Sequence, residues 1–511
     1  MSWNCGGGTF QPNKTEPSRT FVPPAFASKQ TLDKRRIAVL PLQNISPDAK
    51  DEYFADGLTE EMISTMTKIG GLKVIAKTSV TGYTRGDKKI DQIARELEVG
   101  TVIEGSVRKS ENKLRITVQL IDCESSNYLW SESYDRKMED IFAVQSEISK
   151  SVAEALKVNI LPVEEKRLDQ NLGADPDAYS LYLRGRSLWN ERSRNSLMKA
   201  IGYFEDALGK DPEFARAYSG LADCYIVLVN HGYLSSAEGY KRARDALAKA
   251  LSLDESLAEA HASLGHILSE VWDWIGAEEE FVKAIENNPN YAKAHHWYSI
   301  HLLSVGQIDA AIQELKIAEE LDPLSPMIHA YAGGLYIYAR RYDDAMEELD
   351  RSLQLDPNFV PAHANRSDAC LAKSMFQEAI AELDWVSKHV PQSTYWKVER
   401  TFVYVMSGRR EEGDRLLKEC EDAPDLDQLE PQRLAIIYSK LGNTDRAFEL
   451  IEKAFERHSI TPFQVRQSPF YATITSDPRF EELFMKTLQL TGHPASVKLK
   501  TGAELNQGRQ G

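Results

Sequence analysis

The chain has 511 residues, more than one hydrophobic core usually supports, so we expect at least two domains or a domain followed by a repeat array. Apolar residues make up 42% and charged residues 27%, proportions that exclude disorder throughout. The net charge of -16 argues against affinity for nucleic acid or anionic membranes, because either polyanion would repel an acidic surface.

The first 36 residues are rich in Gly, Pro, Ser and Thr and show no apolar periodicity, so we expect a flexible segment. They lack the features of an export signal, and no stretch of the chain reaches the roughly 18 apolar residues of a membrane span. The five cysteines are far apart and never form a CxxC arrangement, which is typical of reduced thiols. We therefore expect a cytoplasmic protein without membrane insertion.

Residues 37–160 predict a small α+β domain. The apolar run at 37–40, closed by Pro41, has the character of a buried strand, and residues 114–120 alternate strictly between apolar and polar side chains. In chain order we expect strands at 37–40, 73–76, 101–107, 114–120 and 128–134, and helices at 59–68, about 93–97 and 138–158. The predicted order is β-α-β-α-β-β-β-α.

The segment YFADGLTEE, residues 53–61, is the most distinctive part of this domain. We expect Gly57 to make a turn and Asp56 or Thr59 to cap the helix that follows. Glu60 and Glu61 then lie in the first turn, where the helix dipole favours acids. The alternative, that residues 56–61 bind a cation or a small ligand, stays open at this point.

Six motifs carry a resemblance to a known family. They are IAVLPLQNISPD at 37–48, YFADGLTEEMI at 53–63, IARELEV at 93–99, VIEGSVR at 102–108, LRITVQLID at 114–122 and YLWSESYDR at 128–136. Together they resemble the FlgO-like, TolB-amino-terminal-like domain. That resemblance implies an architecture in which the domain sits between an output module and a C-terminal tetratricopeptide array. The output module is a nucleotide cyclase, a winged-helix domain or a kinase, and none is evident in this sequence.

The rest of the chain repeats with a strict period. Small residues recur every 34 positions, as 311 minus 277 shows, at Ala277, Ala311, Ala345, Ala379, Gly413 and Ala447. Pro289, Pro323, Pro357 and Pro391 share the interval. This period resembles the tetratricopeptide family, in which a small residue lets two helices approach closely. We expect a linker at 161–175, an all-α superhelical solenoid of about eight hairpins at 176–488 and a flexible tail at 489–511.

Four histidines also follow the period, namely His261, His295, His329 and His363. Packed helices lie roughly 10 Å apart, whereas zinc needs ligands at about 2 Å, so we expect these side chains to pack in the helix seams. No phosphate-binding, dinucleotide-binding, zinc-protease, hydrolase or kinase motif is present. The sequence therefore predicts no catalytic residue, no metal ligand and no cofactor, and hence no enzyme.

The inner face of the array is the candidate binding surface. Helix register places an apolar and aromatic set there: His296, Trp297, Ile300, Leu303, Tyr331, Ile337, Tyr338, Tyr395, Val398 and Phe402. Exposed aromatic residues at this density are typical of a site for a partner protein or peptide. The alternative is that the tail or the first domain fills the groove in cis.

These observations predict a protein-interaction scaffold or regulatory adaptor that holds a peptide or helix of another protein. A second hypothesis is the regulatory remainder of a cyclase, kinase or transcription regulator that acts on an output module in trans. A role in envelope or motility assembly is suggested only by the FlgO and TolB resemblance. The sequence carries no signal for an oligomeric state.

Overall fold

The computed structural model describes residues 32–83, 88–110, 112–169, 175–390, 394–423 and 431–490. Most of the predicted N-terminal segment, residues 170–174 of the predicted linker and the predicted tail from residue 491 lie outside these ranges. In the described ranges no helix has the length and apolarity needed to cross a membrane. Cys123, Cys224, Cys370 and Cys420 are buried free thiols.

A mixed sheet forms the N-terminal domain. Its strands are β1 (Arg36–Val39), β2 (Gln43–Asn44), β3 (Lys73–Val74), β4 (Thr101–Ser110), β5 (Lys113–Asp122) and β6 (Tyr128–Lys137). The order is β3-β1-β4-β5-β6, with β2 beside β4, and the pairs are parallel up to β4 and antiparallel beyond it. Alternate residues of β5 are buried, as its polar alternation predicts.

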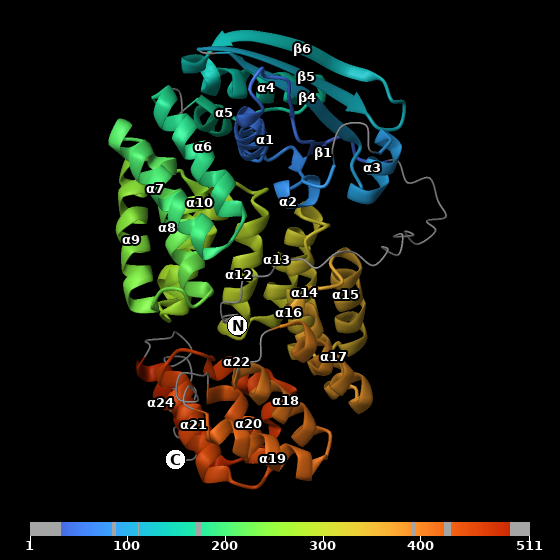
Figure 1. The fold of residues 1–511 in the computed structure, drawn as a ribbon, viewed down its shortest axis with the longest axis vertical. Helices are drawn as coiled ribbons and strands as arrows, with labels where there is room; N and C mark the ends of the chain where they lie inside the picture. Colours follow the sequence, from blue (N-terminus) through green and yellow to red (C-terminus); the bar gives the residue numbers. More distant parts are fainter. Residues whose placement is uncertain are drawn as a thin grey trace, which may run out of the picture.

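Helices cover one face of this sheet. They are α1 (Glu52–Met66), α2 (Lys77–Val80), α3 (Ile90–Leu97) and α4 (Ile141–Ala155), with α5 (Pro162–Asp169) following in the segment predicted as linker. Figure 1 shows α1 between the sheet and the helical array. The opposite face carries polar pairs such as Arg115 with Asp135 and Thr117 with Ser133. The predicted α+β class is confirmed, and the predicted elements occur in the expected order, with β2 and α2 in addition.

The expected cap at residues 56–59 is wrong, because α1 begins at Glu52 and Gly57 lies inside it. A Cβ atom at Gly57 would lie 2.8 Å from Cδ2 of Leu183, so glycine is needed there for helix packing. Thr59 has a different role as well. Its hydroxyl donates to the Ala55 carbonyl at 2.8 Å and accepts from the Leu42 amide at 3.0 Å, which ties α1 to the sheet.

The array consists of consecutive antiparallel helix pairs (Figure 1). The pairs are α6 (Pro176–Asn190) with α7 (Arg194–Lys210), α8 (Ala215–Asn230) with α9 (Ser236–Leu253), α10 (Ala258–Glu270) with α11 (Trp274–Asn287), α12 (Ala292–Ser304) with α13 (Ile308–Leu321), α14 (Pro326–Tyr338) with α15 (Tyr342–Leu355), α16 (Val360–Ala372) with α17 (Phe376–His389), α18 (Thr394–Met406) with α19 (Arg410–Glu421), and α20 (Pro431–Lys440) with α21 (Thr444–Glu456). A C-terminal segment follows, comprising α22 (Pro462–Gln467), η4 (Pro469–Tyr471), α23 (Ala472–Thr475) and α24 (Pro478–Leu490).

Small residues set the close helix contacts of the array. The periodic alanines Ala277, Ala311, Ala345, Ala379 and Ala447 have no exposed surface. A Cβ atom at Gly333 on α14 would lie 2.4 Å from Cγ of Leu349 on α15. The predicted superhelical solenoid is confirmed, and its period follows from this requirement for small side chains at each seam.

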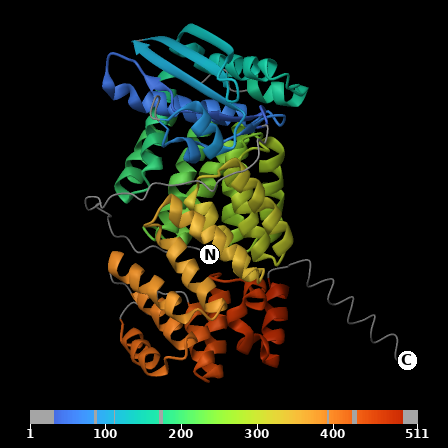
Figure 2. The ribbon, with the colours of Figure 1, turned by 90° about the vertical axis from the view of Figure 1, so that its right-hand side faces the viewer.

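The N-terminal domain lies at one end of the molecule, over the first half of the array (Figure 2). Asn290 donates to the carbonyls of Thr67 and Ile69 at 3.1 and 3.3 Å. Further along, Asp322 accepts from the hydroxyls of Thr78 and Ser79, both at 2.6 Å. One hydrophobic core runs without a break from β1 through the domain to α10.

Candidate functional site

The predicted groove residues do not form an open aromatic surface. Leu303, Tyr331, Ile337, Tyr338, Val398 and Phe402 are buried, and His296, Trp297, Ile300 and Tyr395 are half-buried. Trp297 stacks on His266 with ring centroids 4.5 Å apart, and His296 meets the edge of Tyr331 at 5.1 Å. Whether these residues bind a partner stays a prediction.

The C-terminal segment accounts for much of this burial. The Phe470 ring packs edge to face on Phe402 at 5.4 Å. Thr461 donates to the Ser304 carbonyl at 2.7 Å, and Gln467 donates to the Gly306 carbonyl at 2.8 Å. Residues 461–470 therefore fill part of the groove. They belong to the predicted array, whereas the predicted tail from residue 491 lies outside the described residues.

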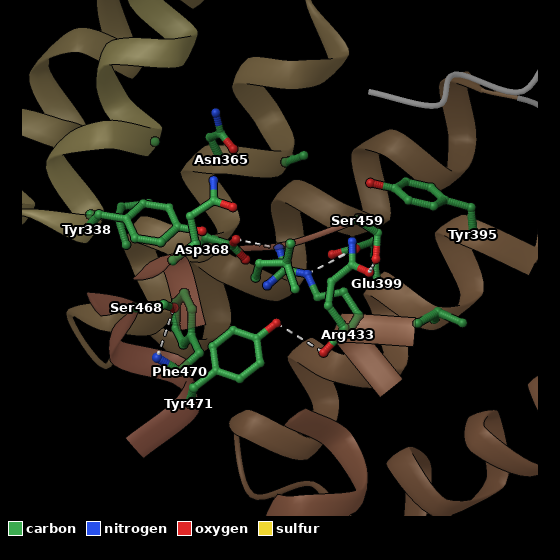
Figure 3. Close-up of a pocket in the computed structure, with 17 residues that line it drawn as sticks. Tyr338, Asn365, Asp368, Tyr395, Glu399, Arg433, Ser459, Ser468, Phe470 and Tyr471 are labelled. Atoms are coloured by element: carbon green, nitrogen blue, oxygen red, sulfur yellow. Dashed lines mark hydrogen bonds and ion pairs between the residues drawn. The ribbon is translucent and has the colours of Figure 1, made fainter. Parts of the chain in front are cut away.

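A pocket of about 110 Å³ remains between α14, α16, α18, α20 and the C-terminal segment (Figure 3). Four predicted groove residues line it, namely Ile337, Tyr338, Tyr395 and Val398. His296 instead lines a separate cavity beside the N-terminal domain, and the remaining predicted residues line neither. The structure therefore brings together only part of the set that helix register predicted.

Charged side chains from three helices meet in this pocket (Figure 3). Arg433 of α20 donates from Nη2 to Asp368 at 2.5 Å and from Nε to Glu399 at 3.0 Å. Burial disfavours the guanidinium charge, but Asp368 and Glu399 hold the pKa of Arg433 far above its usual value. Burial also raises the pKa of Asp368, although Arg433 opposes this shift. Two carboxyl groups here face one guanidinium, so acidic side chains outnumber cations in the pocket wall.

The four periodic histidines have hydrogen-bond partners that the sequence analysis did not predict. Each Nδ1 atom lies 2.5 to 2.7 Å from a glutamate 19 residues later, in the pairs His261–Glu280, His295–Glu314, His329–Glu348 and His363–Glu382. Each Nε2 atom lies within 3.1 Å of a backbone carbonyl. The four glutamates also recur every 34 residues, so the same period carried the signal for both partners.

One of the periodic histidines lies in a cluster of side chains that could hold a metal ion. Glu319, His329 and Glu348 offer ligand atoms within 4.8 Å of one another. However, His329 Nδ1 contacts Glu348 and its Nε2 contacts the Pro323 carbonyl at 2.9 Å, so neither nitrogen has a free lone pair for a metal. The arrangement is that of an ion pair in a helix seam.

Comparison with protein families supports the two-part architecture. Residues 33–151 match the model described as HilA/YgeH-like transcriptional regulator, second domain. The FlgO-like resemblance of the same segment is not confirmed by this match. Two tetratricopeptide models match at residues 299–358 and 432–457, inside the predicted array.

Two kinds of curated relatives align with the chain. "Putative adenylate cyclase 3" of Rhizobium meliloti (strain 1021) is 36% identical over 255 residues, which cover 49% of this chain and 43% of that protein. "Transcriptional regulator HilA" of Salmonella typhimurium is 22% identical over 234 residues, which cover 45% of this chain and 40% of that protein. The chain therefore spans less than half the length of these relatives.

Solved structures of similar arrays include the Pseudomonas aeruginosa pilF protein, at 21% identity and a TM-score of 0.34 over 43% of this chain and 97% of that one. Another is YrrB, described as a TPR protein with an unusual peptide-binding site, at 26% identity and a TM-score of 0.27 over 39% of this chain and 96% of that one. The chain carries a tetratricopeptide array behind a mixed-sheet domain that matches the HilA/YgeH-like second-domain model.

Proposed function

We propose that this protein is a non-catalytic, regulatory interaction scaffold and that the pocket of Figure 3 anchors a side chain of a partner protein. The observation that carries this proposal is the convergence of Tyr338, Tyr395, Asp368 and Glu399 on one pocket in the concave face. A volume of about 110 Å³ suits one side chain. Aromatic walls and two carboxyl groups against one guanidinium favour a partner side chain with an apolar stem and a hydrogen-bond donor or cation at its tip.

The test uses the full chain as bait with Tyr395→Ala, because Tyr395 is half-buried at the pocket and its truncation should leave the helices intact. Phe376→Ala is the matched control, since Phe376 is an aromatic residue that is 37% exposed and does not line the pocket. We expect a partner that the control retains and Tyr395→Ala loses, and that crosslinks to a photoreactive residue at position 395. Equal retention by both variants would contradict the proposal.

A second proposal is that the chain regulates an output module in trans. It is supported by the 36% identity to the adenylate cyclase relative and by the match to a transcription-regulator domain. Addition of the purified chain to a separately expressed cyclase module should change the rate of cyclic nucleotide formation. The chain alone, with ATP or GTP and a divalent metal, should give no turnover. An unchanged rate across cyclase modules would argue against action on a cyclase.

A further inference from the structure

A second cavity, of about 730 Å³, lies where the N-terminal domain meets the inner side of the array, and we refer to it as the junction cavity. α1 and α2 supply one side of it, and α6, α8, α12 and α14 supply much of the rest. Its volume falls in the range of about 300 to 1,000 Å³ that is usual for small-molecule sites, and domain junctions often hold such sites.

The acidic side chains of α1 already have cationic partners in this cavity. Glu61 pairs with Arg216 in a buried ion pair. Glu60 accepts from Arg186 Nε and from Lys77 Nζ, both at 2.9 Å. The charges of Glu60 and Glu61 are thus paired within the protein.

The wall formed by the array carries four cations, Arg186, Arg192, Arg216 and Lys293, and three acids, Asp223, Glu259 and Asp322. Glu259 and Asp322 accept hydrogen bonds from hydroxyl groups of the N-terminal domain. Lys293 Nζ lies 3.4 Å from each Asp223 oxygen, a long contact. Asp223 also accepts from Ser263 at 2.7 Å and lies 3.5 Å from Arg186, so its negative charge is shared. Arg192, an exposed residue of the lining, has no ion-pair partner in the described part of the chain. Lys293 therefore shares its carboxylate with Arg186, and Arg192 has no carboxylate within ion-pair distance among the described residues.

The titration of Lys293 agrees with this imbalance. Burial lowers the pKa of Lys293 to about 8, and the charges of Arg192 and Arg186 add to the effect, while Asp223 opposes it. A second negative charge placed beside Lys293 would stabilise its protonated form.

Aromatic surfaces accompany these cations. The Arg192 guanidinium lies 3.5 Å, and Lys293 Nζ 5.3 Å, from the centroid of the Trp189 ring, and Tyr182 and Tyr291 also line the cavity. Trp189 is only 5% exposed, yet its Nε1 donor has no hydrogen-bond partner among the described residues. A buried donor without a partner is costly, and a bound acceptor is one way to satisfy it.

We propose that the junction cavity binds a small organic anion, whose carboxylate or phosphate group pairs with Lys293 and Arg192 and whose apolar body lies against the aromatic lining. This site is separate from the partner pocket at α18, so the proposal stands or falls independently of partner binding. Because both the domain and the array line the cavity, such a ligand would contact both parts of the protein at once.

Isothermal titration calorimetry on the full chain tests the proposal with two anionic probes and their neutral counterparts. Adenosine 5′-monophosphate is compared with adenosine, and 4-phenylbutyrate with 4-phenylbutanamide, so that the phosphate and carboxylate sources are distinguished. We expect at least one anion to bind saturably and at least about 10-fold more tightly than its neutral counterpart. Absence of saturable binding by both anions at millimolar concentration would overturn the proposal, as would equal binding of the neutral compounds.

Variants locate the site. Lys293→Gln and Arg192→Gln should each lower the affinity for the anion about 10-fold. Lys249→Gln, at an exposed lysine outside the cavity, should leave the affinity unchanged. Asp223→Asn should raise the affinity for the anion, because it removes the carboxylate that competes for Lys293. Arg192 is exposed, so its substitution is testable even if Lys293→Gln lowers the helical circular dichroism signal. Wild-type affinity in Arg192→Gln together with unchanged affinity in Asp223→Asn would refute the assignment.

Discussion

His329 Nδ1 lies 2.7 Å from Oε2 of Glu348, which is 19 residues away in sequence and on the second helix of the same hairpin. Burial opposes a charge on this imidazole, but the hydrogen bonds to Glu348 and to the Pro323 carbonyl raise the pKa of His329. The pair therefore acts as an ion pair that links the two helices of the hairpin.

The raised pKa of His329 predicts a pH-dependent contribution to stability. The contribution is fully present below the unfolded-state pKa of about 6.5 and is lost as pH rises through the higher folded-state value. His329→Gln should therefore lower the free energy of unfolding by about 3 kcal/mol near pH 6 and by less near pH 9. Urea unfolding at both pH values measures this. His389→Gln, at an exposed histidine, is the control, and an equal loss at both pH values would contradict the prediction.

Replacement of Glu319 should increase stability, in contrast to replacement of His329. Burial and the neighbouring Glu348 raise its pKa to about 7, so the charged form costs folding free energy as pH rises from the unfolded-state value toward 7. Glu319→Gln should leave stability unchanged near pH 4 and increase it near pH 8. Thermal melts at the two pH values check this, and a decrease near pH 8 would show that the carboxylate stabilises the fold.

Gly333 and Gly202 form a matched pair for the packing of the seams. A methyl group at Gly333 would overlap Leu349, so Gly333→Ala should cost about 1 to 3 kcal/mol. At Gly202, inside α7, nothing lies within 4 Å of the added Cβ atom, so Gly202→Ala should stabilise the protein by about 0.5 to 1 kcal/mol. Denaturant titrations of both variants measure the difference, and effects of the same sign would contradict this account.

Replacement of Arg433 should lower the free energy of unfolding far more than replacement of an exposed arginine. Arg433→Met leaves Asp368 and Glu399, which are 9% and 8% exposed, without their cation, and should cost about 3 to 5 kcal/mol. Asp368→Asn in the same chain should recover part of this loss. Arg341→Met removes a partner from the exposed Asp344 and should cost less than about 1 kcal/mol. Similar losses in the two single variants would show that the pocket ion pairs contribute little.

Docking of the N-terminal domain can be probed at Asn290. This side chain is 7% exposed and binds two carbonyls of the domain, so Asn290→Ala should cost about 1 to 3 kcal/mol. Hydrogen exchange should increase at the end of α1 and on α12. Asn358→Ala, at an exposed asparagine, should change neither measurement. Exchange that increases in the array but not in α1 would mean that the two parts open separately.

The repeats and the order of the main elements along the chain were predictable because they depend on local periods. The 34-residue period predicted that Ala311 and Ala345 lie in the seams, and the alternation of apolar and polar residues predicted β5. The helix start at Glu52 was not predictable, because Gly57 is explained by Leu183, which is distant in sequence. The burial of Phe402 was missed for the same reason, since Phe470 on another element covers it. β2 and α2 are too short to show any period.

The N-terminal domain holds the array at two separated points, through α1 against α6 and through Thr78 and Ser79 against Asp322. A stack of hairpins deforms like a spring, with small rotations at each seam that add along its length. A rigid domain bound at two positions along the array limits these rotations and so fixes the superhelical pitch between the two positions. The C-terminal segment restrains the second half of the array as well, because Thr461 and Gln467 bind the Ser304 and Gly306 carbonyls, so bending and twisting should be small in both halves of the superhelix.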